Sequence, residues 1–232
     1  MTSMNVAHKP AAILFDFGGT LDADGVAWKD RFRRLWCEEV GEIASAQFDP
    51  VFYAVDDALV GTIPATTSFY DTVEKIARGV SLEMGRFDDV VGARIAKRFV
   101  EESLERIRGN VLVLRDLSRR YRLGIVSNFY GNLSAICREV GLSPFLATVI
   151  DSTVVGVCKP NPEIFHAALR VLQIEPAQAV FVGDSLQRDM AGARAIGMAH
   201  VWLTPKLFPE SRACCPNDPV AHGMEEVRAL FA

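Results

Sequence analysis

Asp16, Ser127 and Asp184 each stand at the end of an apolar run of the sequence, and their residue types suit phosphoryl and metal chemistry. Two carboxylates such as Asp16 and Asp184 repel each other unless a cation lies nearby, and hard oxygen ligands suit Mg²⁺. The Ser127 hydroxyl, together with backbone N–H groups at a helix N-terminus, can hold phosphate oxygens. These residues therefore predict a magnesium site that handles a phosphoryl group, provided that the fold brings them together.

Lys159 adds the positive charge that such a site requires. A lysine in this position would be a fixed cation beside a carboxylate nucleophile and a transferring phosphoryl group. Asp189, which follows Asp184 closely in the sequence, could orient the lysine. The alternative for Asp189 is an ion pair with an arginine of its own helix.

The apolar runs are continuous rather than alternating, as expected of strands that helices cover on both faces. Strands are predicted at 11–15, 123–126, 148–151, 179–182 and 200–203. Helices are predicted at 111–120, 133–140, 162–172, 187–196 and 224–230. This alternation predicts an α/β fold with a doubly wound parallel sheet. Such sheets bind ligands beyond the carboxyl ends of their strands, so Asp16, Ser127 and Asp184 are expected to meet at one edge.

The segment 24–108 is different, because it carries helical periodicity with almost no strand signal. It is predicted to be an inserted helical domain. Sharp turns are expected at Gly25 and at the Gly109-Asn110 pair, where the chain crosses between the two parts. The helices of the insert are predicted at 29–40, 50–60, 68–84 and 88–107. The α/β core then comprises residues 1–23 and 109–232.

The first predicted helix of the insert interleaves basic and aromatic side chains, a pattern that also occurs in nucleic-acid binders. Helical spacing favours another interpretation, namely an apolar stripe packed inside the insert and a solvated basic face. The apolar stripe comprises Phe32, Leu35 and Trp36, and the basic face comprises Arg31, Arg33 and Arg34.

The chain has 232 residues, half of them hydrophobic, and its 25 Lys and Arg against 29 Asp and Glu give a net charge of −4. This composition is typical of a soluble globular protein and argues against binding to nucleic acid or to a membrane surface. No apolar run approaches the ~18 residues of a membrane span, and residues 1–10 lack a secretory pattern, so a cytoplasmic protein is expected. The five cysteines form no disulfide framework, and the adjacent Cys214 and Cys215 alone do not close a metal site. Residues 204–219, with four prolines, are predicted to be an irregular loop.

Four short segments together resemble the four motifs of the haloacid dehalogenase-like hydrolases, in the same order and at strand ends. The segments are Asp16-Phe-Gly-Gly-Thr20, Ser127-Asn128, Lys159-Pro160 and Gly183-Asp184-Ser185-Leu-Gln-Arg-Asp189. The resemblance implies that Asp16 is a nucleophile, that the helical insert is a substrate-selecting cap, and that the aspartyl-phosphate formed is hydrolysed by water. It also implies that Thr20, Ser127, Asn128 and Lys159 bind the phosphoryl group. The implied Mg²⁺ ligands are Asp16, the Gly18 carbonyl and Asp184, with Gly183, Ser185 and Asp189 in support.

Gly18 departs from the pattern of the phosphatases in this family, which carry a second aspartate at that position. That aspartate serves as general acid and then as general base, a contribution worth roughly 10²–10⁴ in rate. Asp22 and Asp24 are close in sequence, but the chain is expected to turn away into the insert after Thr20. A site without this acid would still act on a leaving group that is a weak base.

The leading prediction is a Mg²⁺-dependent hydrolase of a small phosphorylated molecule. Dehalogenation is disfavoured, because the family's dehalogenases lack the metal-binding Gly-Asp that Gly183-Asp184 matches here. One alternative is a phosphonate hydrolase. The phosphonate hydrolases of this family carry a small residue at the position of Gly18 and use a cap lysine to form a Schiff base with the substrate. The other alternative is a non-catalytic binder or regulator of a phosphorylated ligand. The lysines of the predicted cap are Lys29, Lys75 and Lys97. No motif of the sequence identifies the substrate or the oligomeric state.

Overall fold

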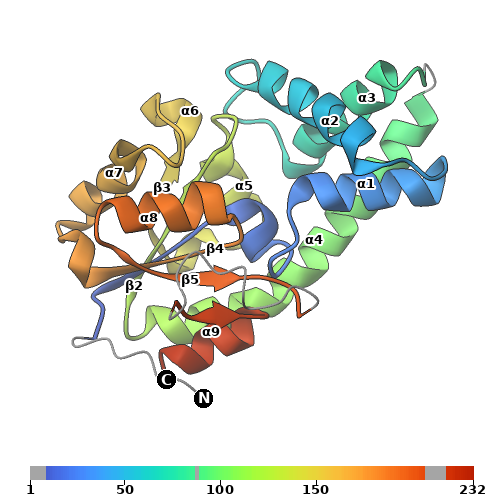
Figure 1. The fold of residues 1–232 in the computed structure, drawn as a ribbon. Coiled ribbons are helices and arrows are strands. Elements are labelled where there is room, and N and C mark those ends of the chain that lie inside the picture. Colours follow the sequence, from blue (N-terminus) through green and yellow to red (C-terminus); the bar gives the residue numbers. More distant parts are fainter. Residues whose placement is uncertain (1–8, 87–88, 207–217) are drawn as a thin grey trace.

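A computed structural model of the chain describes residues 9–86, 89–206 and 218–232. Its sheet is parallel throughout, with the strand order β3-β2-β1-β4-β5-β6 (Figure 1). The strands are β1 (Ala12–Phe15), β2 (Arg122–Ser127), β3 (Leu146–Asp151), β4 (Ala179–Gly183), β5 (Ala199–Leu203) and β6 (Val220–Ala221). The predicted doubly wound parallel sheet is confirmed. Because β1 lies between β2 and β4, the strand ends that carry Asp16, Ser127 and Asp184 are neighbours.

Helices cover both faces of the sheet, which explains why its strands are continuous apolar runs. Ile13 and Phe15 of β1 point into a core shared with α4, α5 and α9, whereas Leu14 points into a second core shared with α7 and α8. The helices of the α/β part are α5 (Leu133–Glu139), α6 (Ser152–Val155), α7 (Pro162–Leu172), α8 (Ala191–Ala195) and α9 (Met224–Leu230). The predicted helix at 187–196 is a turn at Leu186–Met190 followed by α8.

Four helices form a unit beside the sheet, hereafter the helical insert: α1 (Trp28–Glu39), α2 (Ser45–Leu59), α3 (Phe69–Glu83) and the first part of α4 (Asp89–Ser118) (Figure 1). The predicted stripe of Phe32, Leu35 and Trp36 is buried there, and Phe32 stacks on Phe99 of α4 at 4.5 Å between ring centroids. The predicted solvated basic face is wrong for Arg31, which is buried. Arg31 lies beside the apolar stripe on the helix, and the buried Asp22 carboxylate compensates its charge.

The predicted sharp turn at Gly109-Asn110 is wrong, because α4 runs without interruption from Asp89 to Ser118 and joins the helices predicted at 88–107 and 111–120. The apolar stripe of this helix continues past the pair and buries Val113 and Leu117. Burying such side chains is worth roughly 1.5–3 kcal/mol each, which exceeds the penalty of about 1 kcal/mol for a glycine inside a helix. α4 thus reaches from the helical insert into the α/β part as one rod (Figure 1).

The sharp turn at Gly25 is confirmed: its φ is +95°, and a Cβ there would lie 2.6 Å from the Thr204 Cα. α2 begins at Ser45 rather than at Pro50, which lies inside the helix. Most of the predicted irregular loop lies outside the described residues, and strand β6 was not predicted.

Among the helices of the described part of the chain, none has the length and apolar character needed to cross a bilayer. Cys37, Cys137 and Cys158 are free thiols, and Cys214 and Cys215 lie outside the described residues.

Candidate active site

Lys159 lies at the centre of a buried cluster of charges at the carboxyl edge of the sheet. Its Nζ is 2.7 Å from Asp16 Oδ1 and 2.7 Å from Asp189 Oδ1. The side chains of Lys159 and Asp189 are buried, and that of Asp16 is 11% exposed. Burial alone would lower the pKa of Lys159, but the Asp16 and Asp189 carboxylates outweigh it and raise that pKa. The lysine is therefore held as a cation beside Asp16.

Asp184 adds a third carboxylate to the cluster. Oxygens of Asp16, Asp184 and Asp189 all lie within 4.8 Å of one another. Burial raises the pKa of Asp184 well above its ordinary value, and the negative charges of Asp189 and Asp16 add to that effect. Burial also raises the pKa of Asp189 to about 6, against the opposing effect of Lys159. Three carboxylates thus share one lysine, so the acidic groups of the cluster outnumber its basic group.

A magnesium ion fits this donor set. Mg²⁺ is commonly held by one or two carboxylates, with water and phosphate oxygens in its other positions. Asp189 is occupied by Lys159 and by the Ser185 N–H, which donates to Asp189 Oδ2 at 3.0 Å. Asp16 and Asp184 are therefore the residues that would hold the ion. An added cation would favour the ionised form of Asp184 and so oppose the effects of burial and of the neighbouring carboxylates on its pKa.

Mg²⁺ should raise the thermal unfolding midpoint of the protein, because an ion that binds only the folded state stabilises it by about 2.7 kcal/mol at one hundred times its Kd. Asp184→Asn should lose most of this response. Glu163→Gln, at an exposed carboxylate of α7, should keep it. Thermal melts over a range of Mg²⁺ concentrations make the comparison, and equal responses of Asp184→Asn and wild type would contradict the assignment of Asp184.

Asn128 and Gly183 hold the charged side chains in place. The Asn128 amide donates to the Lys159 carbonyl at 3.1 Å and accepts from the Lys159 N–H at 2.7 Å, so it fixes the backbone that carries the lysine. A Cβ on Gly183 would lie 2.3 Å from Asp189 Oδ2, so the absence of a side chain there lets Asp189 approach. These contacts make Asn128 a positioning residue for Lys159.

Thr20 and Ser127 lie at the same edge as the cluster. Thr20 is buried in the tight turn Phe17–Leu21, and its Oγ1 donates to Asp184 Oδ1 at 3.1 Å. Ser127 is the buried last residue of β2, the strand that pairs with β1. The fold therefore brings residues from all four sequence motifs to one edge of the sheet.

Trp28 fills the space beside Gly18. A Cβ on Gly18 would lie 3.1 Å from Trp28 Nε1 and 3.3 Å from Trp28 Cε2. The indole packs against Phe99 and Phe129 at 5.2 and 5.8 Å between centroids. Its Nε1 donates to Asp22 Oδ2 at 2.8 Å. The Trp28 indole thus occupies the space into which a longer side chain at position 18 would project.

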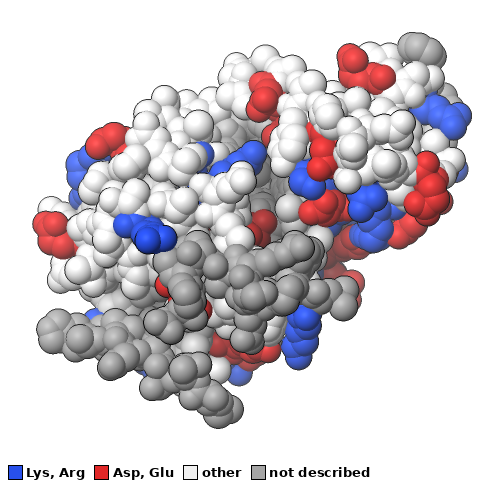
Figure 2. Space-filling model, viewed as in Figure 1, with Lys and Arg blue, Asp and Glu red and all other residues white. Residues whose placement is uncertain are grey.

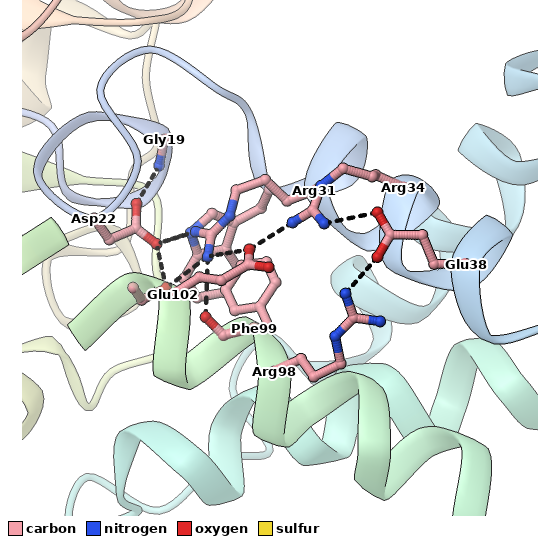
Figure 3. A network of polar contacts seen from close by, with 10 residues as sticks. Gly19, Asp22, Arg31, Arg34, Glu38, Arg98, Phe99 and Glu102 are labelled. Atoms are coloured by element: carbon pink, nitrogen blue, oxygen red, sulfur yellow. Dashed lines mark hydrogen bonds and ion pairs between the residues drawn. The ribbon is translucent and has the colours of Figure 1, made fainter. Parts of the chain in front are cut away.

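Asp22 is the centre of a second buried network, which ties the turn after Asp16 to the helical insert (Figure 3). Its Oδ1 accepts from the Gly19 N–H at 2.7 Å. Its Oδ2 accepts from Trp28, from Arg31 Nη1 at 2.8 Å and from Ser103 Oγ at 3.2 Å. Burial raises the pKa of Asp22, although Arg31 and the hydrogen bonds oppose that effect. These four donors engage both oxygens of Asp22.

Asp24 is also engaged away from the cluster. Its Oδ1 accepts from the Asn110 amide at 3.2 Å, and its Oδ2 pairs with Arg106 at 3.0 Å. The Asn110 amide also donates to the Leu21 carbonyl. As expected from the sequence, neither Asp22 nor Asp24 is placed to replace the acid that Gly18 lacks.

Gly18→Ala should lower the free energy of unfolding by about 1 kcal/mol, at the low end of the cost of overpacking, because its Cβ would press on the Trp28 indole. Gly109→Ala is the matched control. It lies within α4 with nothing inside 4 Å of the added methyl, so it should stabilise the protein by about 0.5–1 kcal/mol. Urea titration of both variants measures the two values, and equal signs would contradict this description of Gly18.

Two tryptophans of the site were not predicted from the sequence. No role is predicted for Trp28, because its contact with Gly18 depends on how the helical insert folds back onto the turn after Asp16. Trp202 lies within β5, and its Nε1 donates to the Asp184 carbonyl at 2.9 Å. Neither role has a local signal in the sequence.

A family model for haloacid dehalogenase-like hydrolases matches residues 10–197. Haloacid dehalogenase-like hydrolase domain-containing protein 3 of Bos taurus is 40% identical over 126 residues, which cover 54% of this chain and 50% of that protein. Phosphoserine phosphatase of Thermus thermophilus is 38% identical over 77 residues, 33% of this chain and 31% of that protein. The chain spans about half the length, or less, of these curated relatives.

Among solved structures, the HAD-hydrolase YfnB of Bacillus subtilis, bound to magnesium, has a TM-score of 0.60 at 21% identity. The match covers 97% of this chain and 99% of that one. At 21% identity, this similarity shows that the two chains share a fold and nothing beyond that.

Proposed function

This chain belongs to the haloacid dehalogenase-like hydrolase family, and we propose that it is a Mg²⁺-dependent hydrolase of a small phosphorylated molecule, with Asp16 as the nucleophile. The observation that carries the proposal is the buried cluster in which Lys159 lies between Asp16 and Asp189, with Asp184 beside them. The phosphoserine phosphatase among the relatives supports a phosphate ester as substrate. The magnesium in the YfnB structure supports the choice of ion.

Each residue of the cluster has its own role in the proposed phosphoryl transfer. The Asp16 carboxylate attacks phosphorus, and the bond to the leaving oxygen breaks as the new O–P bond forms. Lys159, Thr20 and Ser127 bind the phosphoryl oxygens, where positive charge and hydrogen-bond donors stabilise the transition state. Mg²⁺ held by Asp16 and Asp184 would add positive charge there. Water then attacks phosphorus, releases phosphate and restores Asp16.

The turn after Asp16 supplies no proton for the leaving group. Gly18 has no side chain, Trp28 fills the adjacent space, and Asp22 is engaged by four donors. Because a positioned general acid is worth roughly 10²–10⁴ in rate, an alkyl phosphate needs a donor from another part of the fold. An aryl or acyl phosphate has a weakly basic leaving group and does not.

The lysines of the helical insert argue against the phosphonate hydrolase. A Schiff-base lysine needs a lowered pKa. Burial would lower the pKa of Lys29, but its bonds to Asp30 and Asp49, at 2.8 and 2.9 Å, raise it. Lys75 and Lys97 are exposed on their helices.

Phosphate release from an aryl phosphate, with and without Mg²⁺, tests the proposed function. Release that depends on Mg²⁺ is expected. Saturable, Mg²⁺-dependent binding of phosphorylated ligands with no turnover would contradict the proposal and favour a non-catalytic binder. Borohydride trapping of an imine on a lysine of the insert would favour the phosphonate hydrolase instead.

A further inference from the structure

The side chain of Trp202 is hydrogen-bonded to the backbone of Asp184. Its indole Nε1 donates to the Asp184 carbonyl oxygen at 2.9 Å. Trp202 is 5% exposed and packs in the core that β1 shares with α7 and α8. A buried indole N–H usually has a hydrogen-bond acceptor. The acceptor here belongs to a residue that would hold Mg²⁺.

Asp184 lies just beyond the pairing of β4 with β5. β4 ends at Gly183, and the last residue pair between the two strands joins Gly183 to Trp202. The pairing therefore stops one residue before Asp184, where the chain leaves the sheet. A hydrogen bond to the Asp184 carbonyl restricts rotation of the backbone at this point. It therefore also restricts the direction in which the Asp184 side chain leaves the backbone.

The carboxylate of Asp184 is held from the strand on the other side of β4. β4 lies between β1 and β5, and Thr20 in the turn after β1 donates to Asp184 Oδ1 at 3.1 Å. Gly19 in the same turn has a φ of +87°, and a Cβ there would lie 2.6 Å from Asp184 Oδ2. The turn after β1 thus holds the carboxylate of Asp184, and Trp202 of β5 holds its backbone.

Magnesium makes the direction of a ligating carboxylate important. Mg²⁺ requires near-ideal octahedral geometry, with oxygen ligands at about 2.0–2.1 Å. A carboxylate that is already directed correctly loses less freedom when the ion binds. Contacts that orient a metal ligand from outside are typically worth about 10–100-fold in metal affinity or activity.

We propose that Trp202 is a positioning residue for the Mg²⁺ site, an inference that rests on the proposed function. Its indole N–H fixes the backbone of Asp184, so that the carboxylate is directed before the ion arrives. The surface of the molecule is hollowed between the helical insert and the α/β part (Figure 2), but the Trp202 side chain is enclosed in the core. Trp202 therefore acts through Asp184 rather than by contact with a substrate.

Trp202→Phe and Trp36→Phe, each titrated with MgCl₂ in the absence of substrate and followed by calorimetry, test this role. Phenylalanine keeps an aromatic ring in the core but removes the N–H. Trp36 of α1 is the matched control, because it is 4% exposed and packs on Phe48 at 6.3 Å between ring centroids. Trp202→Phe should raise the Kd for Mg²⁺ by about 10–100-fold. Trp36→Phe should keep the wild-type Kd.

Kinetics at high Mg²⁺ distinguish positioning of the ligand from general damage to the site. When Mg²⁺ saturates Trp202→Phe, its KM for an aryl phosphate should equal that of the wild type, because the residues that bind the phosphoryl group are unchanged. A KM that stays raised at saturating Mg²⁺ would show a wider disturbance of the site and would overturn the inference.

A measurement with Trp202 intact applies even if Trp202→Phe does not fold. The chain has three tryptophans, so nitrogen-15 in their indole groups gives three N–H signals in an NMR spectrum. Trp28→Phe and Trp36→Phe each remove one signal and thereby assign the third to Trp202. Mg²⁺ should shift the Trp202 signal with the midpoint found by calorimetry. A Trp202 signal that does not move while Mg²⁺ binds would overturn the inference.

The outcomes separate this inference from the proposed function. An unchanged Kd in Trp202→Phe, or an equal rise of the Kd in Trp36→Phe, would overturn the role of Trp202. Either result, with phosphate release by the wild type still dependent on Mg²⁺, would leave the proposed function standing. Absence of Mg²⁺ binding by the wild type would overturn both, because the proposed function requires the ion.

Discussion

Asp16→Asn should abolish phosphate release, with a loss of about 10⁴-fold or more, because the amide cannot act as the nucleophile that the covalent route requires. The loss should be the same for aryl and alkyl phosphates, since both need the first attack. Phosphate release at saturating Mg²⁺ measures the effect.

The thermal midpoint of Asp16→Asn serves as its control. Lys159 keeps its ion pair with Asp189 in this variant, so the fold should persist and the lost activity should reflect chemistry. Residual turnover close to the wild-type rate in a folded Asp16→Asn would contradict the role of Asp16.

Asp22→Asn should cost about 3–5 kcal/mol of unfolding free energy, the usual consequence of breaking a buried ion pair on one side. The side chains of Asp22 and Arg31 are 0% and 5% exposed. Both Asp22 oxygens face donors, so either orientation of an asparagine amide would set an NH₂ group against another N–H or O–H. At about 2–4 °C per kcal/mol for a chain of this size, the midpoint should fall by roughly 6–20 °C.

Glu38→Gln is the comparison for Asp22→Asn. Glu38 pairs with Arg34 and Arg98 at the exposed end of the network that contains Asp22 and Arg31 (Figure 3). Exposed pairs of this kind contribute little to stability, since water and salt screen them. Urea titration of both variants should therefore show a large loss for Asp22→Asn alone. Equal losses would mean that the buried network does not anchor the insert to the turn after Asp16.

The sheet and the meeting of Asp16, Ser127 and Asp184 at its carboxyl edge could be predicted because their signals are local. A continuous apolar run followed by a polar residue marks a buried parallel strand and its carboxyl end. The residues that follow β1, β2 and β4 meet at one edge because parallel strands all end on the same side. The main wrong prediction is the sharp turn at Gly109-Asn110. The glycine favours a turn locally, but the burial of Val113 and Leu117 stabilises a continuous helix there.

The partners that cross between the helical insert and the α/β part could not be predicted from spacing. Arg31 pairs with Asp22 and with the Phe99 carbonyl of α4, and Tyr130 finds Asp56 on α2. These contacts depend on how two separately patterned segments pack together. One signal was available: Arg31 lies at helical spacing between Trp28 and Leu35, on the side of α1 that packs inward.

The most direct test of the central claim is to find the phosphoryl group on the protein. The wild type is mixed with an aryl phosphate and Mg²⁺, quenched in acid during turnover, and digested for mass analysis of its peptides. The phosphoryl group is expected on the peptide that contains Asp16, and it should be absent in Asp16→Asn. Turnover with the phosphoryl group on another residue, or with the same labelling in Asp16→Asn, would contradict Asp16 as the nucleophile.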